Sequence, residues 1–157
     1  MEHIISVLVE NRFGVLAHIA GLFSGRGFNI DSLAVGETQD STVSRMTIVV
    51  KGDDMVVEQI LKQLNRLIDV IRVDDLSEEK HIERELMLLK ISTSQKSRSE
   101  IIEIADIFRT KIVDVQQSTV TVEAAGSADK LAALIDMVRP YGIKELVRTG
   151  RIAMARG

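Results

Sequence analysis

The first half of the chain alternates between two spacings of hydrophobic residues. Strand-like patterns, with apolar residues at alternate positions, predict β-strands over residues 4–10, 29–37, 43–51 and 70–76. Apolar residues three or four positions apart predict a helix over 14–24 and a second helix that starts after a capping Asp53 or Asp54. The polar residues 38–42 predict a turn. The order β-α-β-β-α-β is that of a ferredoxin-like unit, complete within residues 1–76.

The same order returns after a polar segment, 77–82, that predicts a linker. Strands are expected over 85–92, 112–115, 118–125 and 143–148, and helices over 100–109 and from a capping Ser127 to Val138. Residues 94–99 are interpreted as a polar loop, and the last nine residues, TGRIAMARG, as a tail. We therefore expect an α+β protein with two tandem ferredoxin-like βαββαβ modules, 1–76 and 83–157. Each would be a four-stranded antiparallel sheet with helices on one face.

The size of the modules predicts that two chains associate. Each module spans roughly 75 residues, which is small for a core that is stable on its own. A four-stranded sheet also leaves edge strands whose main-chain groups are unpaired. Pairing of modules from two copies would cover these surfaces, so we expect a homodimer.

Composition narrows the class of function. The 20 Lys and Arg against 23 Asp and Glu give a net charge of −3, which argues against nucleic acid or a membrane surface as the main partner. The chain has no Cys, and its three His are far apart in sequence, so no metal site is expected. No apolar run approaches the roughly 20 residues of a membrane span, and the acidic start lacks a signal-peptide pattern. A cytoplasmic protein is expected.

One glycine-rich stretch, residues 10–30, raises the question of an anion site: ENRFGVLAHIAGLFSGRGFNI. Its GxG at Gly25 and Gly27 follows a helix and precedes a strand, whereas a dinucleotide fingerprint follows a strand and opens a helix. A Walker loop is absent from the sequence. Gly25 and Gly27 are therefore interpreted as residues that end the helix and allow a tight reversal.

Gly14 has a different position, where the first strand gives way to the first helix. The amides of Gly14, Val15 and Leu16 have no acceptor within the helix and carry the positive end of its dipole, so a carboxylate fits there. Asn11 offers both a donor and an acceptor three residues earlier. Together these groups suit a free amino acid. From the residues alone, the alternative stays open that Asn11 is only a turn residue and Gly14 only a flexible helix start.

Several segments carry a resemblance that spans essentially the whole chain. They are residues 5–33, ISVLVENRFGVLAHIAGLFSGRGFNIDSL, then SRMTIVV, LIDVIRVDDL, HIERELMLLKI and the ending VRTGRIAMARG. With these segments the chain resembles the small, regulatory subunits of acetolactate synthase, also called acetohydroxyacid synthase. The resemblance implies that residues 1–76 form an ACT domain, a ligand-binding ferredoxin-like module. It implies that residues 83–157 form the C-terminal domain of that family.

The resemblance also implies a function. Such a subunit binds the large catalytic subunit, raises its activity and makes it sensitive to feedback inhibition by valine in branched-chain amino-acid biosynthesis. The catalytic subunit is a transferase that uses thiamine diphosphate, a divalent metal and FAD. No cofactor and no catalytic residue of its own is expected in this chain.

In similar proteins, valine binds between two ACT domains. Carried over by motif, one wall consists of Asn11, Gly14, Val15 and Leu16, and the opposite wall, from the second chain, consists of Asn29 and Ile30. The ligand's carboxylate would meet the amides of residues 14–16, and its ammonium the oxygens of Asn11 or Asn29. Its branched side chain would enter a pocket lined by Leu16 and Ile30.

Two other functions are compatible with parts of the sequence. An enzyme in its own right could use Asp74 with Asp75, Glu83 with Glu85, or His81, but these charges flank strand ends near the linker and form no recognisable nucleophile–base arrangement. An ACT-type amino-acid sensor could instead regulate another enzyme or a transcriptional system. The acidic balance and the lack of a helix with clustered basic residues weaken the latter. The basic tail residues Arg148, Arg151 and Arg156 are predicted to lie on a protein-contact surface.

Overall fold

The computed structural model describes residues 2–25 and 28–157, and its contacts divide the chain into two compact units. The first contains the residues up to Ile82 together with Arg151–Gly157, and the second spans Glu83–Gly150. The chain therefore passes from the first unit to the second at residues 82–83 and returns at residues 150–151.

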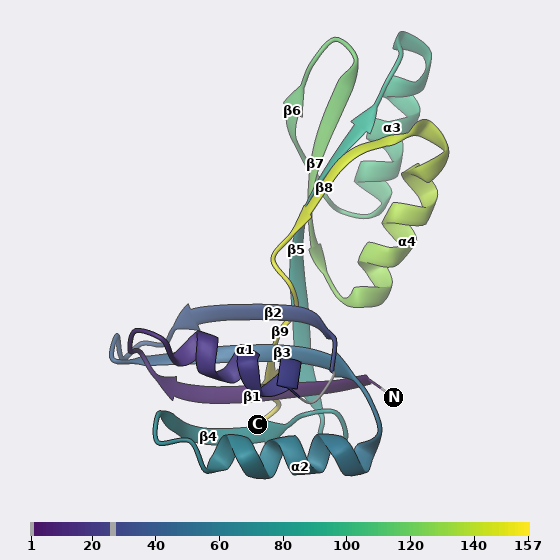
Figure 1. Ribbon diagram of the computed structural model, residues 1–157. Coiled ribbons are helices and arrows are strands. Elements are labelled where there is room, and N and C mark those ends of the chain that lie inside the picture. Colours follow the sequence, from purple (N-terminus) through teal and green to yellow (C-terminus); the bar gives the residue numbers. More distant parts are fainter. Residues whose placement is uncertain (1, 26–27) are drawn as a thin grey trace. The chain divides into compact units, whose positions relative to one another are not determined.

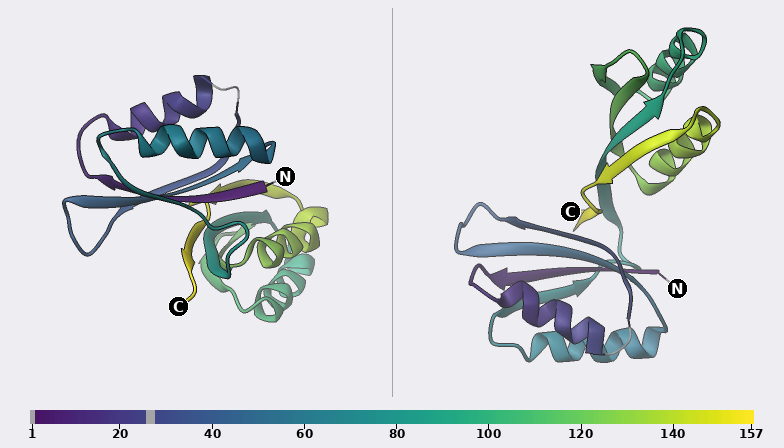
Figure 2. Two further views of the ribbon diagram at one scale, coloured as in Figure 1. Left: turned by 90° about the horizontal axis from the view of Figure 1, so that it is seen from below. Right: turned by 45° about the horizontal axis from the view of Figure 1, so that its top comes forward.

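The body of the first unit has the predicted β-α-β-β-α-β order. Its elements are β1 (Glu2–Glu10), α1 (Val15–Gly25), β2 (Ile30–Glu37), β3 (Val43–Lys51), α2 (Asp54–Asn65) and β4 (Val70–Asp75). The strands pair in the order β2-β3-β1-β4, with every pair antiparallel. Figures 1 and 2 show α1 and α2 on the same face of this sheet. The ferredoxin-like fold predicted for this half is confirmed.

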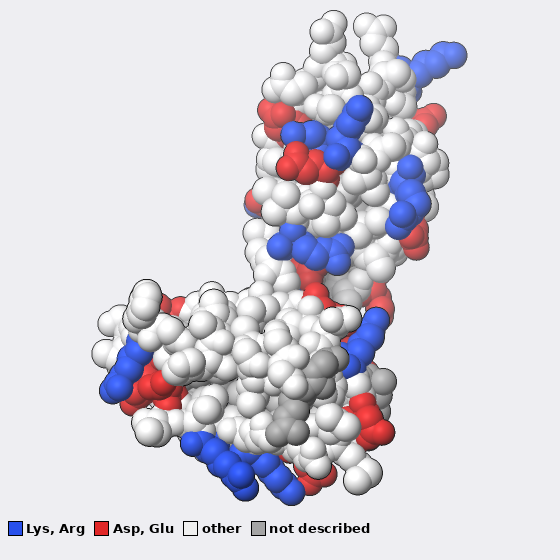
Figure 3. All heavy atoms as spheres, viewed as in Figure 1, with Lys and Arg blue, Asp and Glu red and all other residues white. Residues whose placement is uncertain are grey.

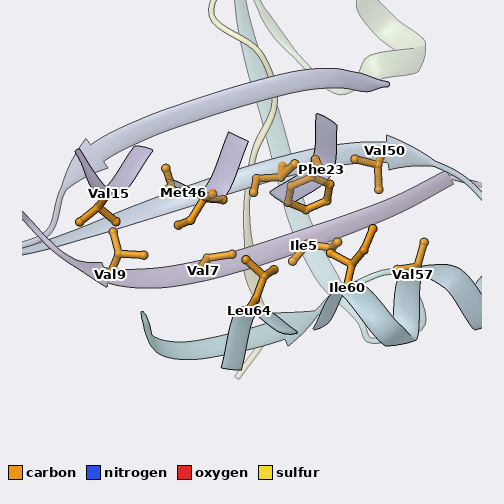
Figure 4. Packing of buried hydrophobic residues seen from close by; sticks show 12 residues of the cluster. Ile5, Val7, Val9, Val15, Phe23, Met46, Val50, Val57, Ile60 and Leu64 are labelled. Atoms are coloured by element: carbon orange, nitrogen blue, oxygen red, sulfur yellow. The ribbon is translucent and has the colours of Figure 1, made fainter. Parts of the chain in front are cut away.

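Alternation along the strands and helical spacing along α1 and α2 produce one core between the sheet and its helices. In α1, Val15, Ile19 and Phe23 are buried and four residues apart, so they share one face. They meet the inward residues of β1, of β3 and of α2 (Figure 4). The buried members of this core are Ile5, Val7, Val9, Val15, Ile19, Phe23, Met46, Ile48, Val50, Val57, Ile60 and Leu64.

The second unit repeats the first. Its elements are β5 (His81–Ser92), α3 (Gln95–Ile107), β6 (Lys111–Val115), β7 (Thr119–Gly126), α4 (Ala128–Val138), the short 3₁₀ helix η1 (Arg139–Tyr141) and β8 (Ile143–Arg148). The strand order β6-β7-β5-β8 matches that of the first sheet, and α3 and α4 cover one face (Figure 1). A separate core lies between them, with Met87, Leu89 and Ile91 of β5 fully buried.

The start of α3 differs from the prediction. The polar residues 94–99 were expected as a loop before a helix over 100–109, yet the helix spans Gln95–Ile107. Ser94 accepts a hydrogen bond from the Ser97 amide, and the Ser97 hydroxyl accepts one from the Ser94 amide. This reciprocal cap satisfies donors that a polar loop would leave to water, so polar side chains here begin the helix.

The C-terminal end also differs. Residues 152–155 form a ninth strand, β9 (Ile152–Ala155), which pairs with β5, so the second sheet has five strands instead of four. Contacts place residues 151–157 with the first unit, although the sequence suggested one domain over 83–157. The expected linker 77–82 is also shorter, because β5 already begins at His81. Both differences have one cause. The C-terminal residues and the start of β5 gain partners that are remote in sequence.

Helix α1 extends one residue beyond the predicted range 14–24, and Gly25 is its last residue. Gly27, the second glycine of the GxG, lies outside the described residues. Among the described residues, no helix is long and apolar enough to cross a membrane.

Candidate functional site

The turn between β1 and α1 holds Asn11 in a defined position. The Asn11 amide donates to the Thr42 carbonyl at 2.7 Å. Its side-chain Nδ2 donates to the Ser41 carbonyl at 3.0 Å and to Glu37 Oε1 at 3.3 Å. Because Nδ2 has acceptors within the chain, the side chain can offer Oδ1 to a ligand. Asn11 thus connects the β1–α1 turn to the turn between β2 and β3.

Gly14 lies directly before the first residue of α1 and has a backbone φ of +86°. That conformation favours glycine, and a Cβ built at this position would have no atom within 4 Å. The first turn of α1 carries no acidic side chain to neutralise its amides. The Val15 amide donates a long hydrogen bond of 3.5 Å to the Arg12 carbonyl. The turn therefore presents a helix N-terminus without a side-chain cap and with open space at the Cβ position of Gly14. Val15 is buried in the core, whereas Leu16 is exposed beside this space.

The other predicted wall lies elsewhere in the same chain. Asn29 is exposed and Ile30 begins β2 half-buried. Ile30 pairs with Val50, which also pairs with His3 near the start of β1. Asn11 follows the opposite end of β1. One chain therefore does not bring the six predicted residues together, and a site built from all of them requires two chains.

Phe28 positions the start of β2. Its amide donates to the Phe23 carbonyl at 3.2 Å, and its ring lies directly against Gly52, where a Cβ would collide with the ring. Glycine at 52 therefore allows the close approach that anchors the residue before Asn29. The sequence interpretation missed Gly52, because it lies just after β3 and only the tertiary contact reveals its role.

The surface next to α1 is uncharged. The helix sequence VLAHIAGLFSG contains no Asp, Glu, Lys or Arg, and the part of the surface over α1 that is not drawn in grey is mostly white in Figure 3. Its outward residues Leu16 and Gly21 are exposed. Beside it, β2 is an edge strand of the sheet, and Val35 of β2 is 47% exposed. Solvent-facing helices normally carry charges, so this surface has the character of an interface.

The carboxylates that are candidates for catalysis have structural partners instead. Asp75 accepts hydrogen bonds from the Ser77 amide at 3.0 Å and hydroxyl at 2.5 Å, and lies 3.1 Å from His3 Nδ1. Burial raises the pKa of the Asp75 carboxyl, but the bonds from Ser77 and His3 outweigh that effect and leave the pKa lowered. Asp74 forms an ion pair with Arg72 at 2.9 Å. An ionised, hydrogen-bonded carboxylate is suited to holding structure together.

The candidates in β5 are likewise engaged. Glu85 is 8% exposed and lies 3.3 Å from the Arg148 guanidinium. His81 Nδ1 lies 2.9 Å from the Glu79 carbonyl oxygen. Among the described residues, no group of three or more His, Asp or Glu side chains could hold a metal ion.

His3 is a buried polar residue that the sequence interpretation left without a role. It is 6% exposed, with Nε2 2.9 Å from Asp54 Oδ1 and Nδ1 3.1 Å from Asp75 Oδ2. The signal was present in the alternation, because His3 precedes the inward residues Ile5, Val7 and Val9 at the same spacing. A polar ring at an inward position needs partners, and the two aspartates provide them.

The fold and the open turn define a class: an ACT-type unit followed by a second ferredoxin-like unit. Comparison with known families agrees with that class. The family model described as "AHAS small subunit-like ACT domain" matches residues 5–72. The model described as "Small subunit of acetolactate synthase" matches residues 84–157.

Individual relatives give the same result. The chain is 55% identical to a probable acetolactate synthase small subunit of Archaeoglobus fulgidus, over 100% of this chain and 98% of that protein. It is 53% identical to the acetolactate synthase small subunit of Aquifex aeolicus, over 99% of this chain and 81% of the relative. The crystal structure of the small subunit from Thermotoga maritima superposes with a TM-score of 0.90 at 40% identity, covering 100% and 98% of the two chains. The chain therefore belongs to the acetolactate synthase small-subunit family.

Proposed function

We propose that this chain binds the catalytic subunit of acetolactate synthase in the cytoplasm, raises its activity and makes it sensitive to inhibition by valine. The support is membership of the small-subunit family over nearly the whole chain. The catalytic partner condenses pyruvate with pyruvate or 2-oxobutyrate and carries the thiamine diphosphate, the divalent metal and the FAD. This chain contributes regulation.

The observation that carries the effector site is the open N-terminus of α1. Gly14 has a positive φ and free space at its Cβ position, and no acidic residue occupies the first turn. The valine carboxylate binds the amides of Gly14, Val15 and Leu16, where the helix dipole favours a negative charge. Asn11 Oδ1 accepts from the ammonium, while the contacts of Nδ2 with Ser41 and Glu37 hold the side chain in place.

The second wall comes from a partner copy. Asn29 and Ile30 of one chain lie at the far end of β1 from Asn11 of the same chain, so a homodimer through the ACT units supplies the missing side. The uncharged α1, the edge strand β2 and the exposed Leu16 and Val35 favour this surface for dimerisation.

A site shared between two chains explains how a small ligand can regulate. Valine contacts both chains only when the two ACT units are packed in one arrangement, so binding favours that arrangement over others. If the catalytic subunit also binds the arrangements with different affinities, valine binding changes its state. This is the requirement for allosteric coupling.

The test is co-purification of the chain with its catalytic subunit, with acetolactate formation measured with and without valine. We expect a stable complex, higher activity than the catalytic subunit alone, and loss of activity on adding valine. The purified chain alone should form no acetolactate, and robust turnover of pyruvate by it would overturn the regulatory role. A chain that binds valine but neither binds nor activates the catalytic subunit would instead be a sensor for another enzyme.

The same assay compares valine with leucine and isoleucine. These side chains differ by about one methylene, which changes binding by roughly 1–3 kcal/mol in an apolar pocket. We propose valine as the strongest inhibitor of the three, and stronger inhibition by isoleucine or leucine would reassign the effector.

A further inference from the structure

The last seven residues, Arg151–Gly157, form a segment that we call the C-terminal strap. The Arg151 guanidinium binds the Glu2 carboxylate through two bonds, Nη1 to Oε1 at 2.9 Å and Nη2 to Oε2 at 2.7 Å. The Arg151 side chain is only 15% exposed. The hydrogen bond from Arg151 lowers the pKa of Glu2 despite partial burial. A two-pronged Arg–carboxylate pair of this kind is both strong and specific in geometry.

The strap also buries apolar surface of the first unit. Ala153 is 7% exposed and packs with Ile4, Val49 and Leu76. Ile4 and Val49 lie between inward residues of β1 and β3, so they project from the face of the sheet that lacks helices. The Ala153 amide donates to Thr47 Oγ1 at 3.4 Å, and the Arg156 amide donates to the Lys80 carbonyl at 2.9 Å. These contacts dock the strap on the first unit, while residues Ile152–Ala155 also pair with β5.

One contact connects the strap to β2, the strand that begins at the proposed wall of Asn29 and Ile30. The Arg151 amide donates to Ser32 Oγ at 2.8 Å. Ser32 lies two residues after Ile30 on β2, and the pairing of β2 with β3 shifts register between these two residues. Such an irregularity leaves a residue unpaired and disrupts the ladder locally. The bond to Ser32 therefore holds β2 next to the point where its path is least fixed by the ladder.

The strap begins immediately after the second point at which the chain passes between the units. It follows β8, after Thr149 and Gly150, and the chain returns to the first unit at residues 150–151.

We propose that the C-terminal strap, clamped by Arg151 to Glu2 and Ser32, positions the β2 wall of the effector site and docks more firmly when valine binds. This inference rests on the proposed valine site. Valine prefers the docked strap because docking fixes the start of β2, where Asn29 and Ile30 meet the ligand. By reciprocity, valine must then stabilise docking by the same factor.

Hydrogen exchange of the full-length chain tests whether valine binding makes the C-terminal strap dock more firmly. Amides of residues 151–156 should exchange more slowly at saturating valine than without it. Slower exchange is expected at the Arg151 and Ala153 amides, which donate to Ser32 and Thr47.

Calorimetry with variants tests whether docking of the strap strengthens valine binding. Glu2→Gln and Arg151→Gln each remove the charged pair and should weaken valine binding about tenfold, the equivalent of one charge-assisted hydrogen bond. The double variant should lose no more than either single variant, because both remove the same interaction. Arg151→Lys, which keeps the charge, should restore part of the affinity. Arg156→Gln is the matched control, since this residue contacts the first unit through its main-chain amide and its side chain is exposed.

The outcomes separate this inference from the function on which it rests. If the wild-type chain binds valine but strap exchange is unchanged and both single variants bind with full affinity, the strap has no role in the site. If the wild-type chain does not bind valine at all, the proposed function fails and the strap inference fails with it. Thermal unfolding of each variant shows whether a loss of affinity comes from a loss of fold.

Discussion

At the scale of single residues, Gly14 serves two requirements at once. Its φ of +86° is unfavourable for residues with a Cβ, and the space where a side chain would stand is empty within the chain. This combination is compatible with the proposed carboxylate ligand, which must approach the main chain closely.

Gly14→Asp should abolish the valine response. An aspartate before the first helical residue can accept hydrogen bonds from its own helix amides, as N-cap residues do. Its carboxylate would then occupy the place of the ligand's carboxylate and repel it. Isothermal calorimetry with valine measures the loss.

Gly14→Ala is the control for this variant. Alanine bears the same positive φ, which costs about 1–2 kcal/mol for a residue with a Cβ, but it brings no oxygen. It should lower stability like the aspartate while keeping measurable valine affinity. Equal affinities for the aspartate and wild-type proteins would remove Gly14 from the site.

At the scale of helices and strands, α1 and α2 differ in the charge of their outward faces. The α2 sequence contains Asp54, Glu58 and Lys62, whereas α1 contains no charged residue. Both helices bury their inward faces in the same core. The core alone therefore does not explain why α1 is uncharged on the outside, whereas the proposed contact with a second copy would.

Gly21→Glu should dissociate the homodimer. Gly21 is exposed on α1, and a Cβ there would have no atom within 4 Å in its own chain. Replacing glycine inside a helix with glutamate should stabilise the helix itself by about 0.5–1 kcal/mol. The same glutamate would place an unpaired charge in the interface, which is costly. Sedimentation analysis should show monomers at concentrations where the wild type is dimeric.

Gln59→Glu on α2 is the matched control, because it adds the same charge at an exposed position of the other helix. It should leave the dimer intact. Dimers of undiminished stability in Gly21→Glu would move the interface away from α1.

Elements with a clear hydrophobic period were predicted well. The bounds predicted for β3 and β8 agree with those observed, because apolar residues define these strands and turn residues flank them. The start of α3 was missed, because capping serines resemble a loop when only their polarity is considered. The strand β9 was missed for another reason, since its four residues gain their partners from segments remote in sequence. Of the candidate site, the β1–α1 turn follows from local pattern, whereas the pairing of two walls depends on a second chain.

At the scale of the whole molecule, two units with the same strand order differ at one equivalent place. In the first unit, the helix after the first strand begins with an open turn at Gly14. In the second unit, the equivalent helix α3 is closed by the reciprocal Ser94–Ser97 cap. The Arg98 guanidinium nearby donates to the carbonyls of Gln116 and Gln117 at 2.9 and 2.8 Å. The two units therefore share a fold. Of these two helix starts, only that of α1 has the open glycine turn.

This difference predicts how much valine the protein takes up. A symmetric dimer has two equivalent sites, each with the turn of one chain and the β2 start of the other. We therefore expect calorimetric titration to saturate at one valine per chain, with no second class of site from α3. Ser94→Ala should cost about 0.5–2 kcal/mol of stability through the lost cap and leave the stoichiometry unchanged. Two valines per chain, or a stoichiometry that changes in Ser94→Ala, would show that the second unit also binds the effector and that an open glycine turn is not required for binding.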